Sequence, residues 1–391
     1  MLVFRKEWFD NFLIMEEAVR WRKKNIISDA EFDAIASHYQ TPYHSSNIFA
    51  RIGMFVFGLI CVFAFVLLFY MFIGSGSSIA IALQLIIAGS ILYGAALQLV
   101  SNKHFFRSGV IDALIYSAGF NFGSGIIILI NSGSSGFDVD PVIDFACVLP
   151  VVLFLAVRFA DAFLAVLFLC GLMILNALLV LKIETYGQAV LPFEGMLLSY
   201  VMYRMIKRLR LKKNSHYWKK CLDALETGSL VLLYMSGNYF VIRQLSEMLL
   251  HHFVPPGSDI AFAPFFYLFT ILVPMIYTWQ GLKNKDRILT RLSFILLAAG
   301  VLSIRYYHTL LPTETAMILA GVILILLAWA AIRYLRTPRE GFVFHEEDAD
   351  NEAMEAINAL LISRVISKSI PERGDSFGGG QSGGGGAGGG F

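Results

Sequence analysis

The run FARIGMFVFGLICVFAFVLLFYMFI, residues 49–73, contains a single charged side chain, Arg51. A helix of about 20 mostly apolar residues crosses the hydrocarbon core of a bilayer. This run is long enough to do so and has no polar interruption after Arg51. It therefore predicts a membrane-spanning helix.

Nine further stretches of similar character follow. They cover residues 78–100, 109–130, 142–157, 162–181, 187–206, 223–244, 260–281, 290–304 and 314–334. The whole chain of 391 residues is 57% hydrophobic and only 15% charged, whereas soluble domains carry about 25% charged residues. We therefore expect an all-α, polytopic integral membrane bundle of about ten helices. The range is eight to ten, because 142–157 and 290–304 are short.

The chain divides into three regions. Residues 1–48 form a helical module, in which Ser28 and Glu31 fit a capping box. Residues 49–335 are expected to form the bundle, and residues 336–391 are expected to form a tail with an acidic amphipathic helix followed by a glycine-rich, disordered end. The module has a net charge of −1, so it offers no phosphate-binding footprint and no nucleic-acid partner is expected.

The distribution of basic residues predicts the orientation. With the N-terminus in the cytoplasm, the cytoplasmic loops hold fourteen Lys and Arg residues and the external loops hold three. Positive charge concentrates in cytoplasmic loops and near anionic lipid. Both termini are therefore expected in the cytoplasm, with the bilayer as the main partner and residues 346–391 available to a cytoplasmic protein.

A short sequence motif that occurs twice predicts a parallel internal repeat. Asn102-Lys-His-Phe-Phe-Arg107 is followed by Asp112-Ala-Leu, and Asn214-Ser-His-Tyr-Trp-Lys219 is followed by Asp223-Ala-Leu. The repeated units are residues 78–181 and 187–304, four helices apart, so they share one orientation. Repeated units in membrane proteins often flank a substrate site.

The repeated motif places Asp112 and Asp223 about one turn inside the cytoplasmic ends of their helices, where ionisable groups are costly and usually face protein or water. They predict either a matched pair of carboxylates lining a vestibule or two helix N-caps. Glu226, one turn beyond Asp223, adds a third carboxylate.

Deeper in the bundle, Asn121 lies among Gly119, Gly123 and Gly125. Such a segment could break the helix and expose backbone carbonyls to a solute, or it could pack closely against another helix through small residues. Asn238, after Gly237, repeats the pattern in the other unit.

Other chemistry has little support in the sequence. His104 and His216, each followed by two aromatic residues and a base, are typical of interfacial anchors, with pH sensing as the alternative. The four cysteines form no CxxC pair. No nucleotide-binding, hydrolase or zinc-protease motif occurs, so we expect no cofactor, no metal site and, on balance, no enzyme.

The stretch Trp21 to Ile35, with Ile26-Ile27-Ser28 directly ahead of the apolar spans, resembles a bacterial "predicted membrane protein" family of unknown function. In that family a short helical module precedes a polytopic bundle. The resemblance implies a bacterial inner-membrane protein and no particular reaction. The tail from Phe377 to Phe391 is similar in composition to the tails of bacterial TPM-domain membrane proteins, which suggests a tether or docking peptide.

Three functions remain open from the sequence. A transporter or channel for a small solute or ion is favoured by the paired carboxylates and the Gly/Asn segments. A scaffold that recruits partners through its tail is the alternative. A lipid- or glycan-modifying membrane enzyme is the third.

Overall fold

The computed structural model describes residues 2–24, 26–42, 48–73, 76–103, 108–133, 140–183, 187–212, 214–250, 259–260, 262–284, 286–307 and separate positions between 315 and 333. Within these ranges every element is a helix and no strand occurs. The all-α prediction is confirmed for this part of the chain. His104, the tail from residue 336 onward and most of the expected span 314–334 lie outside the described residues.

The N-terminal module consists of α1 (Lys6–Lys23) and α2 (Asp29–His38). The predicted capping box is confirmed: Ser28 Oγ accepts the Glu31 N–H at 3.3 Å, and the Glu31 carboxylate accepts the Ser28 N–H at 2.7 Å. Phe32 of α2 packs on Ala18 and Val19 of α1. The module therefore has a small apolar core of its own.

Up to residue 307, the described helices of the bundle overlap the expected spans. Its helices are α3 (Ile48–Ile73), α4 (Ser78–Lys103), α5 (Gly109–Asn131), α6 (Pro141–Phe159), α7 (Ala162–Leu181), α8 (Gly187–Arg210), the short 3-10 helix η1 (Ser215–Trp218), α9 (Lys219–Met235), α10 (Tyr239–Leu250), α11 (Ala263–Lys283) and α12 (Arg287–Tyr307). Six of them, α3 to α7 and α11, are long and apolar enough to cross a membrane. The chain is thus compatible with a membrane-embedded helical bundle.

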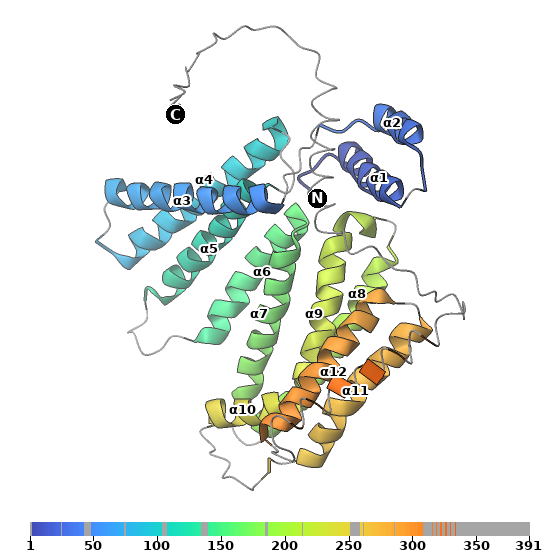
Figure 1. Ribbon diagram of the computed structural model, residues 1–391. Coiled ribbons are helices and arrows are strands. Elements are labelled where there is room, and N and C mark those ends of the chain that lie inside the picture. The colour runs from blue at the N-terminus through green and yellow to red at the C-terminus, as the bar shows by residue number, and fades with distance from the viewer. Residues whose placement is uncertain are drawn as a thin grey trace, which may run out of the picture.

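One expected span has a different structure. Residues 223–244 were predicted as a single helix, but α9 ends at Met235 and α10 begins at Tyr239. Asn238 explains the break, because its Oδ1 accepts the Val241 N–H at 3.3 Å and so caps α10. Figure 1 shows α10 turning away from the line of α9.

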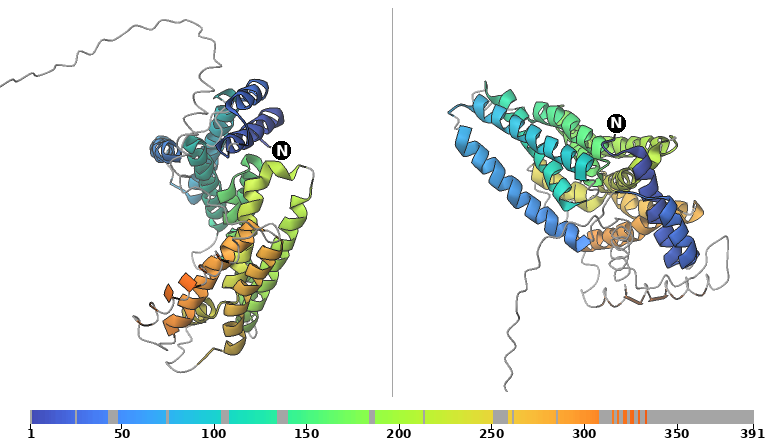
Figure 2. Two further views of the ribbon diagram at one scale, coloured as in Figure 1. Left: turned by 45° about the vertical axis from the view of Figure 1, so that its right-hand side comes forward. Right: turned by 90° about the horizontal axis from the view of Figure 1, so that it is seen from above.

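The bundle is arranged in two groups of helices (Figures 1 and 2). In the first group, α5 packs against α3, α4 and α6. In the second, α9 packs against α8 and α12, and α11 packs against α12. Helix α7 joins the groups, since it packs against α6 on one side and against α8 and α9 on the other. The N-terminal module lies over one end of the bundle, which we call the α1 end.

Glycines set the spacing within the first group. A Cβ at Gly125 of α5 would lie 2.9 Å from the Ala82 carbonyl oxygen of α4, and a Cβ at Gly89 of α4 would lie 3.2 Å from the Ala118 carbonyl oxygen of α5. The two helix backbones therefore approach closely at small residues. Helix α5 remains continuous through Gly119, Gly123 and Gly125.

Candidate functional site

A cavity of about 290 Å³ opens at the α1 end of the bundle. Its wall combines parts of the chain that are far apart in sequence: the N-terminal module, α3, α5, the α6–α7 turn, η1 and α9. Its polar and aromatic side chains are Phe4, Phe9, Arg51, Asp112, Tyr116, Phe159, Asp161, Phe163, Tyr217 and Lys220. We call it the α1-end cavity.

An ion pair forms one wall of the cavity. Asp112 Oδ2 accepts from Arg51 Nε at 2.8 Å and lies 2.7 Å from a second guanidinium nitrogen. Asp112 is only 9% exposed, so the guanidinium partly compensates a carboxylate held away from water. Gly109 permits this geometry, because a Cβ there would overlap the Arg51 carbonyl oxygen.

A second carboxylate is fixed by the α6–α7 turn. Ala160 adopts a left-handed conformation with φ 51° and ends α6. Asp161 then caps α7 by accepting the Leu164 N–H at 2.9 Å through Oδ1. Its Oδ2 accepts the Tyr116 hydroxyl at 3.1 Å. The cavity therefore presents two ordered carboxylates, each with a partner on another element.

The N-terminal module is held to η1 through Asp10. The Tyr217 hydroxyl donates to Asp10 Oδ2 at 2.9 Å, and His216 Nε2 lies 3.1 Å from Asp10 Oδ1. Burial and the hydrogen bond to Asp10 raise the pKa of Tyr217 above its usual value. The Val3 N–H also donates to the Arg158 carbonyl oxygen at 3.1 Å. Hydrogen bonds thus hold the module over the cavity, and His216 takes part in one of these contacts.

A separate group of charges joins α8, α9 and the start of α12. Glu226, 1% exposed, lies 2.5 Å from Lys207 Nζ and 2.5 Å from an Arg210 guanidinium nitrogen. Lys207 also contacts Asp286 at 3.1 Å, and Arg210 contacts Asp223 at 2.8 Å. The order is Asp286, Lys207, Glu226, Arg210, Asp223, with signs alternating. We call these five residues the α8–α9 charge chain.

Helix geometry explains how the residues of the α8–α9 charge chain meet. Lys207 and Arg210 are three residues apart on α8, and Asp223 and Glu226 are three apart on α9, so each pair shares one helix face. Burial acts to raise the pKa of Asp286, but hydrogen bonds from the Leu289 N–H and Lys207 outweigh it and hold the pKa below its usual value. All three acids therefore have charged or backbone partners.

The two asparagines lie in different groups of helices. Asn121 is 4% exposed on α5; its Nδ2 donates to the Ser117 carbonyl oxygen at 2.7 Å, and its Oδ1 has no hydrogen-bond partner among the described residues. Asn238 lies between α9 and α10, where its Nδ2 donates to the Tyr234 hydroxyl at 2.9 Å. Helices α6 and α7 come between α5 and α9, since α5 packs on α6, α6 on α7 and α7 on α9.

The structure distributes the expected carboxylates and asparagines over four places. Asp112 lines the α1-end cavity, and Asp223 and Glu226 belong to the charge chain. Asn121 lies on α5, and Asn238 lies between α9 and α10. Neither aspartate is an N-cap: Ser108 caps α5, and α9 begins four residues before Asp223. Both instead pair with an arginine.

Sequence reasoning missed the basic partners. It treated Lys207, Arg210 and Lys220 as loop charges that orient the bundle, and it gave Arg51 no role. The signal for Arg51 was present, because a lone charge inside an apolar run needs a partner. The pairing of Asp161 was predicted with Arg158, in the same turn. Its contact with Tyr116 left no comparable signal, since the α6–α7 turn that positions Asp161 involves a left-handed residue that is not glycine.

No family model, curated protein or solved structure matches this chain. Its function must therefore be argued from its own residues. Among the described residues, no group of three or more His, Cys, Asp or Glu side chains could hold a metal ion.

Proposed function

We propose that the protein is a membrane transporter or channel that binds a small polar solute in the α1-end cavity. The observation that carries this proposal is the Arg51–Asp112 pair in the cavity wall, where a partly buried carboxylate meets a guanidinium that is 38% exposed. A solute with both charges could exchange with the two members of such a pair. Drug-sized ligands occupy pockets of about 300 to 1,000 Å³, so a cavity of about 290 Å³ fits a small solute.

The aromatic side chains support the same ligand class. Phe9 of α1 and Tyr217 of η1 have ring centroids 5.6 Å apart at the cavity. Aromatic faces contact cations favourably, while Arg51 and the neighbouring basic residue Lys220 suit a carboxylate. A small zwitterion, such as a free amino acid, combines these groups.

The proposal includes the membrane arrangement. We place the protein in a bacterial inner membrane with both termini in the cytoplasm, and count α8, α9, α12 and residues 314–334 with the six long apolar helices as ten spans. The charges of the α1 end support this orientation. In a parallel repeat α4–α7 would correspond to α8–α12; in support, α4 packs on α5 and α6 on α7, as α8 packs on α9 and α11 on α12.

Flux into proteoliposomes tests the proposal. The full chain is reconstituted, and uptake of radiolabelled alanine, acetate and potassium is compared with uptake into protein-free vesicles. We expect protein-dependent alanine flux that falls at least tenfold in Arg51→Gln. Lys182→Gln, at the opposite end of α7, is the matched control. Correctly folded protein that passes none of the three solutes would contradict the proposal.

A further inference from the structure

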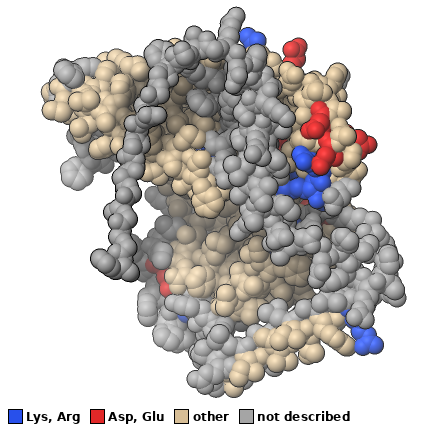
Figure 3. All heavy atoms as spheres, turned by 45° about the horizontal axis from the view of Figure 1, so that its top comes forward, with Lys and Arg blue, Asp and Glu red and all other residues tan. Residues whose placement is uncertain are grey.

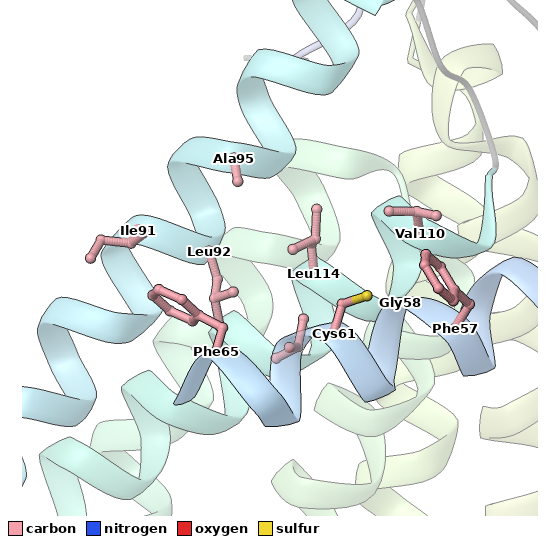
Figure 4. A pocket seen from close by; sticks show the side chains of 10 residues that line it. Phe57, Gly58, Cys61, Phe65, Ile91, Leu92, Ala95, Val110 and Leu114 are labelled. Carbon is pink, nitrogen blue, oxygen red and sulfur yellow. The ribbon is translucent and has the colours of Figure 1, made fainter. Parts of the chain in front are cut away.

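A second, entirely different hollow lies on the side of the bundle between α3 and α4, with α5 as its floor (Figure 4). Its volume is about 270 Å³. Three exposed side chains form its rim, namely Phe57 and Cys61 of α3 and Ile91 of α4. Three buried side chains form its base, namely Val62, Leu92 and Leu114. We call it the lateral groove.

Helix crossing explains why the groove exists. A Cβ at Gly58 of α3 would lie 2.9 Å from Ala113 Cβ of α5, so α3 is pressed onto α5 at a small residue. Helix α4 packs extensively against α5 but makes few contacts with α3. Gln84 of α4 nevertheless donates to the Phe69 carbonyl oxygen at 2.9 Å, which joins α3 and α4 near their connection. Helices α3 and α4 are thus joined near their connection, and α3 rests on α5 at Gly58, which leaves the groove between the two helices.

The chemistry of the groove excludes a polar solute. All ten lining residues are apolar, glycine or cysteine, so a polar molecule that entered would lose its hydrogen bonds to water without replacement. The surrounding surface is also apolar: α3 has a mean hydropathy of 2.9, with only 11% of its apolar window buried. Figure 3 shows no charged side chain on the described surface of this part of the molecule, whereas charges gather over the N-terminal helices.

The size of the groove excludes a helix. Three turns of a helix about 10 Å in diameter occupy more than roughly 1,000 Å³, several times the groove volume. An empty groove is also unfavourable, because its lining would lack van der Waals partners on one side. In a bilayer the remaining occupant is a hydrocarbon chain.

We propose that the lateral groove is a binding site for one acyl chain of a membrane phospholipid. One end of the groove is at Val110, in the first turn of α5, next to the charged α1 end. The lipid therefore belongs to the leaflet on that side, with its headgroup at the level of Arg51 and its chain lying across α5. This site is independent of the solute cavity.

Photo-crosslinking in nanodiscs tests the site. The full chain is reconstituted with phosphatidylcholine that carries a diazirine in the middle of one acyl chain, and adducts are located by mass spectrometry. We expect adducts on the base residues Val62 and Leu114, which are 7% and 9% exposed, as well as on lipid-facing Phe63, which is 70% exposed. Adducts on Phe63 without any on the base residues would overturn the proposal.

A pair of variants on α4 sharpens the test. Ala95→Phe fills the groove and should reduce base adducts at least fivefold while leaving those on Phe63 unchanged. Gly94→Phe adds the same ring one position away, where a Cβ meets nothing within 4 Å, and should change neither. If the two variants give equal numbers of adducts on Val62 and Leu114, the result would count against the site.

A measurement on the native groove does not depend on those variants folding. In detergent, phospholipid should slow alkylation of Cys61 by N-ethylmaleimide at least threefold in a background with Cys147, Cys170 and Cys221 replaced by alanine. A cysteine introduced as Phe63→Cys, with Cys61 also replaced, serves as the lipid-facing reference. Equal slowing at both positions would show ordinary lipid coating and contradict a distinct groove site.

Discussion

The Glu226 carboxylate lies between two cations, 2.5 Å from Lys207 Nζ and 2.5 Å from an Arg210 guanidinium nitrogen. Burial of a carboxylate that is 1% exposed is costly unless such partners compensate for its lost hydration. Lys207 and Arg210 each contact a further acid. The packing of α8 on α9 therefore depends on all five residues of the α8–α9 charge chain.

Replacing Glu226 with glutamine should therefore destabilise the protein. The amide keeps the shape of the side chain but leaves each cation with one acid instead of two, and we expect a loss of about 1–3 kcal/mol. Thermal unfolding in detergent measures it. Glu17→Gln, on the exposed side of α1, is the control and should shift the midpoint by less than a degree. Equal shifts for the two variants would show that the central charge contributes nothing.

The attachment of the N-terminal module can be tested at Asp10. Asp10→Ala removes the acceptor of both His216 and Tyr217, and we expect limited trypsin digestion within residues 1–42 to become at least fivefold faster. Asp33→Ala, an exposed position on α2, should leave the rate unchanged. If Asp10→Ala digests at the wild-type rate, apolar packing alone holds the module.

The opposite end of the bundle offers a test of pH dependence. Asp140 caps α6 and accepts from Lys182 Nζ at 2.6 Å, and these two hydrogen bonds, that of Lys182 first, hold the pKa of Asp140 below its usual 3.8. A depressed folded-state pKa adds stability above the unfolded value, which is lost as the pH falls through the folded value.

Wild-type protein should therefore unfold at a higher temperature than Asp140→Asn at pH 6, and the difference should shrink below about pH 4. Midpoints measured from pH 3 to 7 give the result. Lys182→Gln keeps the cap and should lose only part of the difference. A gap between wild type and Asp140→Asn that stays constant down to pH 3 would rule out this linkage.

The close approach of α3 and α5 predicts a strong effect at Gly109. A Cβ there would overlap the Arg51 carbonyl oxygen and the Phe55 backbone nitrogen, so the helices must separate, at a cost of about 1–3 kcal/mol. Gly109→Ala should lower the unfolding midpoint, whereas Gly53→Ala, with open space around its Cβ, should not. Identical midpoints would mean that the crossing adapts freely.

The sequence predicted some parts of the structure better than others. Apolar runs fixed by bilayer thickness predicted helix limits well, as at 162–181, where the expected and observed bounds coincide. The break at Ser236–Asn238 was not predicted, since it depends on Asn238 capping α10. The carboxylates at Asp112, Asp223 and Glu226 were recognisable as unusual because charge is costly there. Their partners were not, since pairing such as Arg51 with Asp112 depends on how distant helices cross.

The Arg51–Asp112 pair provides the most direct test of the proposed function. If solute exchanges with the pair, Arg51→Met and Asp112→Asn should each reduce alanine flux at least tenfold, and the double variant should be no worse than the more damaging single variant. Such non-additivity is the mark of residues that act together. Unfolding midpoints of the same three proteins separate this from damage to the fold, because an ion pair with only a structural role would leave flux in proportion to the amount of folded protein. A double variant whose loss equals the product of the single losses would show that the two side chains act independently and that the pair is not the solute site.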